Sequence, residues 1–139
     1  MDVFSENIDE LQLFLRIGLT MLLGLLVGIE RGWSMRYRKE GNRTAGIRTF
    51  TLVGLAGGLW GVLAQHLGMN ILGFALLAFV LIIMIGYIRY SMITGDVGLT
   101  TEMAAFVTFT ACVAVTLGYI TLSVAAIIIM TFILSVKPR

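Results

Sequence analysis

The sequence predicts an all-α integral membrane protein, a five-helix transmembrane bundle with its amino terminus outside and its carboxyl terminus inside the cell. Two observations lead to this fold class. The 139-residue chain is 58% hydrophobic and only 13% charged, whereas a soluble domain carries about 25% charged residues. Long apolar stretches also recur along the chain, and nine of its ten Lys and Arg residues fall on one side of the topology that these stretches define.

Five apolar stretches are each long enough to cross a bilayer. At about 1.5 Å per residue they span a hydrocarbon layer of ~30 Å with some tilt or local thinning. The second and third are joined by the short turn Gly68-Met69-Asn70, which requires an antiparallel hairpin, and Gly118-Tyr119 is the one candidate break between the last two. All five belong to one membrane domain, residues 1–139, with spans at about 11–29, 49–67, 71–88, 100–117 and 120–136.

The distribution of charge predicts the orientation. Lys and Arg near the ends of short loops resist translocation and therefore stay inside. If the segment between the first two spans faces inward, the outer side receives only an acidic leader and a short connection. The positive loop then faces anionic headgroups, so we expect the lipid bilayer as a partner and no nucleic acid. The inner cations are Arg31, Arg36, Arg38, Lys39, Arg43, Arg48, Arg89, Lys137 and Arg139.

Glycines in the first two helices recur at a spacing of four residues. Such pairs lie on one helix face and let two backbones approach closely in lipid. Two uses of these faces stay open: packing between helices of one chain, or a seam between two copies, and we expect a homo-oligomer, most simply a dimer. The pairs are Gly24 with Gly28, Gly54 with Gly58, and Gly57 with Gly61.

Ionisable residues inside a membrane are costly and are therefore the first candidates for a functional site. Arg16 lies within the first helix, where it either reaches the outer headgroups or faces the bundle and pairs with a carboxylate. A spacing of three to four residues places a charge, a hydroxyl and a close-packing glycine on one face of this helix. That face consists of Arg16, Thr20, Gly24, Val27 and Arg31.

A second group of polar residues belongs at the inner boundary. Carboxylate and hydroxyl oxygens there are ligands that hard cations such as Mg²⁺ accept. Two other interpretations stay open: Glu102 stabilises the start of the fourth helix through its dipole, or Arg48 and Glu102 form a structural ion pair. The spacing of these residues is not a metal signature, and we expect no cofactor; Mg²⁺ is the one that an ion-binding site or buried charge network of this kind suggests. Its residues are Arg16, Glu30, Arg48, Asp96, Thr100, Thr101 and Glu102.

No sequence feature indicates an enzyme, and we expect no catalytic residue. His66 is the only histidine and lies at the outer end of the second helix. Cys112 is the only cysteine; it lies in an apolar run, where we expect an inert packing residue. The sequence contains no HExxH, no nucleotide-binding loop and no GxSxG.

Three segments resemble the MgtC/SapB family of membrane proteins. Residues 24–31, Gly-Leu-Leu-Val-Gly-Ile-Glu-Arg, are similar to the signature of that family's first helix, and Arg16 matches an arginine commonly found upstream. Residues 45–49, Ala-Gly-Ile-Arg-Thr, resemble the opening of its second helix, Ala-Gly-Leu-Arg-Thr. Residues 98–101, Gly-Leu-Thr-Thr, match a third motif.

The resemblance implies a multi-pass protein of the bacterial inner membrane, linked to Mg²⁺ homeostasis or adaptation to low Mg²⁺ and without an established enzymatic reaction. After Thr101 the chain departs from typical MgtC members and looks more like the first half of larger relatives with a second membrane domain. We therefore leave open whether the sequence is a piece of a longer protein or a short member.

Two functions are consistent with these patterns. The first is a non-enzymatic protein that binds or regulates another membrane protein complex through its glycine faces and basic loop. The alternative is an oligomeric ion transporter or channel with a polar path near Arg16, Arg48 and Glu102. Because five helices are few for a pore within one copy, transport would favour a dimer.

Overall fold

The computed structural model is a bundle of five α-helices, and it describes residues 3–34, 47–94 and 100–136. The number of helices and the all-α membrane fold class agree with the sequence prediction. Except for α1, which is longer at both ends, and α3, which is longer at its carboxyl end, the helices begin and end within two residues of the predicted spans. Their bounds are α1 Val3–Ser34, α2 Ile47–Leu67, α3 Asn70–Thr94, α4 Thr100–Leu117 and α5 Ile120–Ser135.

Two glycines make the tight reversals between helices. Gly68 and Gly118 have positive φ values of 105° and 111°, a conformation that costs an L side chain energy and that often ends helices. The amide of Gly68 donates to the carbonyl of Ala64 at 2.9 Å, and the amide of Tyr119 donates to that of Ala114 at 2.9 Å. These reversals join α2 to α3 and α4 to α5, as the sequence predicts.

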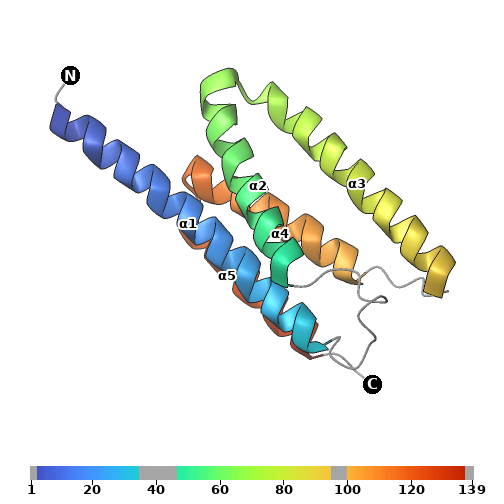
Figure 1. The fold of residues 1–139 in the computed structure, drawn as a ribbon. Coiled ribbons are helices and arrows are strands. Elements are labelled where there is room, and N and C mark those ends of the chain that lie inside the picture. Colours follow the sequence, from blue (N-terminus) through green and yellow to red (C-terminus); the bar gives the residue numbers. More distant parts are fainter. Residues whose placement is uncertain (1–2, 35–46, 95–99, 137–139) are drawn as a thin grey trace.

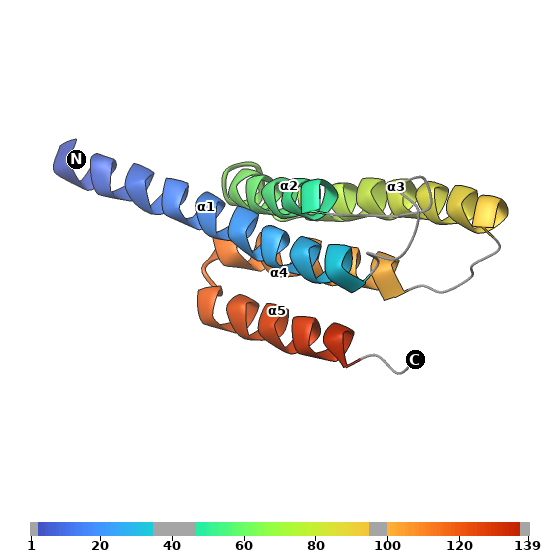
Figure 2. The ribbon, with the colours of Figure 1, turned by 60° about the horizontal axis from the view of Figure 1, so that its bottom comes forward.

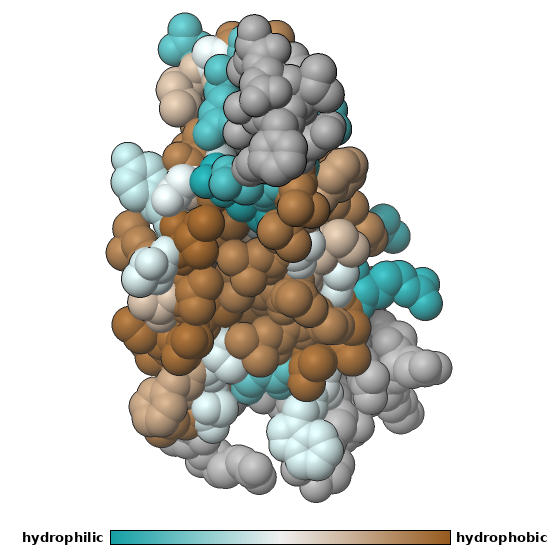
Figure 3. Space-filling model, turned by 90° about the vertical axis from the view of Figure 1, so that its left-hand side faces the viewer, coloured by the Kyte–Doolittle hydropathy of each residue, from teal (hydrophilic) through white to brown (hydrophobic). Residues whose placement is uncertain are grey.

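The helices fall into two classes by length. Three are long and apolar enough to cross a membrane: Glu10–Trp33, Ile47–Leu67 and Asn70–Ile93. The described parts of α4 and α5 are apolar but shorter. Figure 3 shows a belt of apolar residues on one face of the molecule, with hydrophilic residues above and below it. Such a belt is the surface that hydrocarbon covers in a membrane protein.

The helices are arranged in layers around α1 and α4. Figure 2 shows α2 and α3 on one side of this pair and α5 on the other. The carboxyl ends of α1, α3 and α5 and the amino ends of α2 and α4 lie toward the same side of the bundle (Figure 1). Successive helices therefore alternate in direction. Which end faces outward stays a prediction, because the fold alone does not fix it.

The interior is built from α1, α2, α4 and α5, while α3 lies at the edge (Figure 1). Among the described side chains of α3, only Ala75 is buried. The helix touches α4 through Phe79, whose ring stacks on that of Phe109 at 4.3 Å between centroids. The buried core cluster is formed by Leu23, Val27, Phe50, Ala104, Ala105, Ala111, Cys112, Val115, Ile127, Met130 and Leu134.

Candidate functional site

Glycines allow direct backbone contact between α1 and α2. A Cβ atom at Gly24 would collide with the carbonyl of Phe50, and one at Gly54 would collide with the carbonyl of Thr20. One at Gly58 would lie 2.6 Å from Oγ1 of Thr20. Positions rise along α1 as their partners fall along α2, so the two helices pack antiparallel. At Gly24 and Gly54 the contact requires glycine, because any side chain would meet the backbone of the neighbouring helix and force the two helices apart.

The other glycine face of α2 packs against α4. A Cβ at Gly57 would lie 2.7 Å from the carbonyl oxygen of Phe109, and one at Gly61 would collide with Oγ1 of Thr116. Here positions rise together along both helices, so α2 and α4 are parallel neighbours. Gly28 is also buried. The structure thus uses the predicted glycine faces inside one chain, and a seam between copies through them would have to open these contacts.

Three helices meet around Thr20, which is fully buried. Its hydroxyl donates to the carbonyl of Ile17 at 2.6 Å, and its own carbonyl accepts a weak hydrogen bond from Sγ of Cys112 at 3.6 Å. Nearer the end of α2, Nε2 of Gln65 donates to the carbonyl of Thr116 at 2.9 Å. The bonds of Cys112 and Gln65 join neighbouring helices, whereas that of the Thr20 hydroxyl stays within α1. Cys112 is buried, as its position in an apolar run predicts.

The polar face predicted for the first helix is the buried face of α1. Thr20, Gly24, Val27 and Arg31 are all buried, and Arg16 is half-buried. The 3–4 spacing therefore identified this packing face correctly. Arg16 is the residue of this set that retains the most access to the surroundings.

The structure places a buried ion pair at the other end of this face. The side chain of Arg31 is 1% exposed and that of Glu30 is 10% exposed, and Nε of Arg31 donates to Oε1 of Glu30 at 2.9 Å. A buried guanidinium is strongly unfavourable unless a counter-charge lies against it. Glu30 supplies that charge from the adjacent position, although neighbouring residues on a helix do not usually face each other.

The sequence places Arg31 among the inner cations and on the packing face of the first helix, but the candidate site predicted from it does not include this residue. The signal that could have added Arg31 to the site is the face that it shares with Gly24 and Val27. A cation on a packing face must either leave the helix axis for the headgroups or find a carboxylate, and a carboxylate is adjacent in the sequence.

The expected ion pair between Arg48 and Glu102 is not formed by the side chains that the structure describes. Arg48 is exposed, and Glu102 is half-buried and makes interactions of its own. An arginine at the second position of α2 reaches the headgroup level, where water and phosphates solvate it better than a partly buried partner would. The salt bridge that the structure shows between two described side chains is that of Arg31 with Glu30.

The remaining members of the candidate site are not brought together by the described structure. Asp96 and the side chains of Thr100 and Thr101 lie outside it. Within the described residues, no group of three His, Cys, Asp or Glu side chains is placed to hold a metal ion. His66 is exposed at the end of α2, where the sequence placed it. The Mg²⁺ site therefore stays a prediction.

The fold and the buried pair define an all-helical membrane protein with a close-packed, glycine-rich interior. The sequence model of the MgtC family matches residues 17–139, and the chain belongs to this family. The resemblance drawn from the three motifs is thereby confirmed. The family is linked to Mg²⁺ homeostasis in general and is not known for an enzymatic activity. No curated protein and no solved structure matches the chain.

Proposed function

We propose that this chain is a non-enzymatic, multi-pass protein of the bacterial inner membrane that binds or regulates another membrane protein. Its role would be in Mg²⁺ homeostasis or adaptation to low Mg²⁺. Family membership supports the link to Mg²⁺. The structural observation that supports a binding role is the division between a filled interior and a long exposed helix, α3.

The interior of α1, α2 and α4 is filled by contacts between backbones. Gly24, Gly54, Gly57 and Gly61 each have a neighbouring helix at a distance that excludes even a methyl group. Close packing of this kind favours a rigid body over a conduction path within one copy. Interactions with another protein then use the periphery.

Of the three helices long enough to cross a membrane, α3 is the least buried. Phe74, Leu77, Ile82 and Ile85 on this helix are all more than half exposed. In lipid such side chains pack equally well against acyl chains or against another transmembrane helix, so partner binding there does not require the bundle to open. We propose that α3 carries the contact with the regulated protein.

Site-specific photocrosslinking tests this assignment in cells grown at low Mg²⁺. A photoreactive amino acid at Ile82 in α3 is compared with one at Ile129 in α5, which is similarly exposed. We expect a discrete adduct with a second membrane protein from position 82 and none from position 129. Adducts that contain only lipid from both positions would contradict the proposal.

The buried pair of Arg31 and Glu30 favours the alternative, an oligomeric ion transporter or channel. Ionisable groups inside a helical bundle frequently mark ion pathways. The polar path proposed from sequence near Arg16, Arg48 and Glu102 would then include Arg31. Flux of Mg²⁺ into proteoliposomes, read with an enclosed Mg²⁺-sensitive dye, decides the matter. If the Mg²⁺ flux is well above that of empty vesicles and is lost in Arg31→Met, the proposed function changes from regulation of another membrane protein to ion transport.

A further inference from the structure

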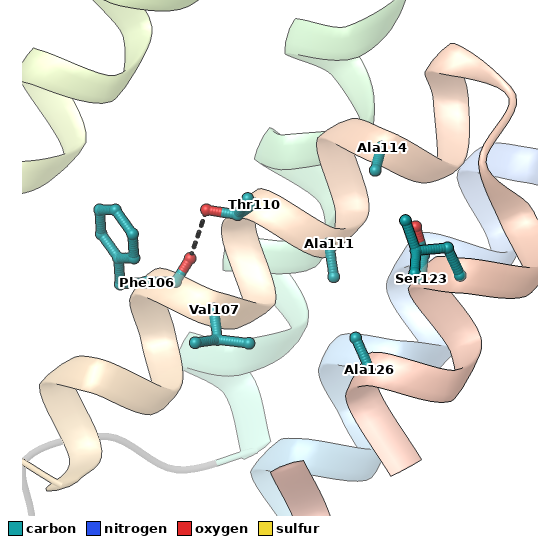
Figure 4. Close-up of a pocket in the computed structure, with 8 residues that line it drawn as sticks. Phe106, Val107, Thr110, Ala111, Ala114, Ser123 and Ala126 are labelled. Atoms are coloured by element: carbon teal, nitrogen blue, oxygen red, sulfur yellow. Dashed lines mark hydrogen bonds between the residues drawn. The ribbon is translucent and has the colours of Figure 1, made fainter. Parts of the chain in front are cut away.

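A groove with a volume of about 350 Å³ lies between α4 and α5. Figure 4 shows side chains from both helices bordering this space. The groove exists because most of its floor is made of small residues, so the two helices leave a channel that larger side chains would fill. We call it the α4–α5 groove; its lining includes Thr110, Ala111, Ala114, Leu122, Ser123 and Ala126.

The lining exposes almost no polar surface to an occupant, and neither of its hydroxyl groups has a free proton to donate. The hydroxyl of Thr110 donates to the carbonyl of Phe106 at 2.9 Å, a bond that Figure 4 draws, and the hydroxyl of Ser123 donates to the carbonyl of Tyr119 at 2.7 Å. Both side chains are thereby tied to their own helix, and none of the lining residues is charged. An ion, a headgroup or a polar ligand would lose its hydration there without compensation.

The size of the groove accommodates a flexible hydrocarbon chain. Its volume is more than twice the ~150 Å³ of an engineered apolar cavity that stays dry and binds benzene. A single acyl chain therefore suits both the volume and the chemistry of the lining.

The surrounding bilayer supplies such a chain. Thr110 and Leu122 at the rim are exposed, so the groove is continuous with the surface that lipid covers. With 18 and 16 residues, α4 and α5 extend only about 27 and 24 Å, less than a ~30 Å hydrocarbon layer. A bilayer thins locally around a hydrophobic stretch that is shorter than its hydrocarbon layer.

We propose that the α4–α5 groove is a binding site for one acyl chain of a membrane phospholipid. To test it, the full chain is purified in mild detergent, titrated with palmitoyl-oleoyl phosphatidylglycerol and weighed by native mass spectrometry. We expect the wild-type chain to retain one such lipid. Dihexanoyl phosphatidylglycerol, which has the same headgroup and short tails, should not displace it.

Two substitutions fill the groove from opposite sides. Thr110→Trp acts at the exposed rim and is easily tolerated by the fold, whereas Ala126→Leu acts on the floor. Each should weaken lipid retention by about tenfold or more, a loss of roughly one decade in affinity. The matched control is Ile128→Trp, because Ile128 is exposed on α5 and lies outside the lining. Circular dichroism verifies the helix content of each variant.

Three outcomes would overturn the proposal. Lipid retention that is equal in Thr110→Trp and wild type would show that the chain binds elsewhere. Equal competition by the short-tailed lipid would assign the binding to the headgroup. A wild-type dimer that Thr110→Trp converts to a monomer would make a second copy, and not a lipid, the occupant. If Ala126→Leu fails to fold, Thr110→Trp alone decides.

Discussion

The two consecutive helices α2 and α3 differ in a way that hydrophobicity does not explain. The more uniformly apolar of the two is α3, yet it lies at the edge of the bundle, whereas α2 is buried along two faces. Both contain glycines. Those of α2 meet neighbouring backbones, while a Cβ at Gly73 or Gly86 of α3 would meet nothing within 4 Å. The difference is spacing: α2 repeats glycine every fourth residue, and α3 does not.

This comparison shows what holds a small membrane bundle together. In water, apolar surface is driven inward, but in lipid an apolar side chain gains nothing from leaving the acyl chains. Helices therefore associate where small residues on one face let backbones approach and dispersion contacts accumulate. In this chain, burial follows the pattern of small residues and is nearly independent of mean hydropathy.

The largest expected effect comes from breaking the glycine contacts of α2. Gly54→Leu should destabilise the protein by more than about 3 kcal/mol, because its side chain would have to displace the backbone of α1. The matched control is Gly73→Leu on α3, which should remain close to wild type because its surroundings are open. Thermal unfolding in detergent measures both. Similar losses in the two variants would show that spacing is not the cause.

The buried ion pair of α1 should have the next largest effect. Arg31→Met alone removes the guanidinium that lies 2.9 Å from the largely buried carboxylate of Glu30 and should cost about 3 kcal/mol. The double variant Glu30→Gln/Arg31→Met should recover a large part of that loss, since it removes both charges. The unfolding free energies of Glu30→Gln, Arg31→Met and the double variant together give the coupling energy between the two side chains. A double variant as unstable as the sum of the singles would mean that the pair does not stabilise the bundle.

A smaller effect is expected at Gly58, where the nearest atoms belong to the side chain of Thr20 and can move. Gly58→Ala should cost about 1–2 kcal/mol, less than a comparable change at Gly54. Self-association as a dimer stays a prediction. Because both glycine faces of α2 are filled within the chain, this variant should lower stability without changing the mass of the purified protein in nanodiscs. A shift from dimer to monomer in a folded Gly58→Ala variant would contradict this expectation and would place a dimer interface at the glycine face of α2.

The orientation can be tested with almost no effect on stability. Cysteine introduced at Asn7 should react with an impermeant thiol reagent added outside the cell, and cysteine at Lys39 should react only after the membrane is opened. Native Cys112 is fully buried, so it should contribute little background, and Cys112→Ala removes it. The reverse labelling pattern would invert the predicted topology.

Much of the architecture can be predicted from the sequence because its signals are local. Apolar runs give the helices, Gly68 and Gly118 give the reversals, and the 3–4 spacing from Thr20 to Arg31 gives the buried face of α1. The choice of partners is a different matter. Two glycine faces on α2 predict two close contacts, but no pattern within α2 says that one contact is with α1 and the other with α4.

The charges were harder to place for a related reason. Arg48 and Glu102 lie at the starts of two parallel helices, so a pairing between them was a reasonable inference from depth. Depth does not determine the direction in which a side chain points, and Arg48 is exposed. Arg31 counts among the inner cations by its depth and is absent from the predicted site, although the helix face that it shares with Thr20, Gly24 and Val27 predicts its burial. The helix face on which a residue lies predicts its burial better than its depth in the membrane does.

The parallel contact between α2 and α4 has a consequence for biosynthesis. Two parallel helices cannot follow one another directly in the sequence; the chain must first return, and α3 is that return. When α2 leaves the ribosome, the helix that will cover Gly57 and Gly61 has not yet been made. Until α4 has been synthesised, α1 and α2 can therefore pack only against each other, with the second glycine face of α2 still uncovered. During this time α3 is surrounded by lipid, and its uniformly apolar surface is stable there without a protein partner.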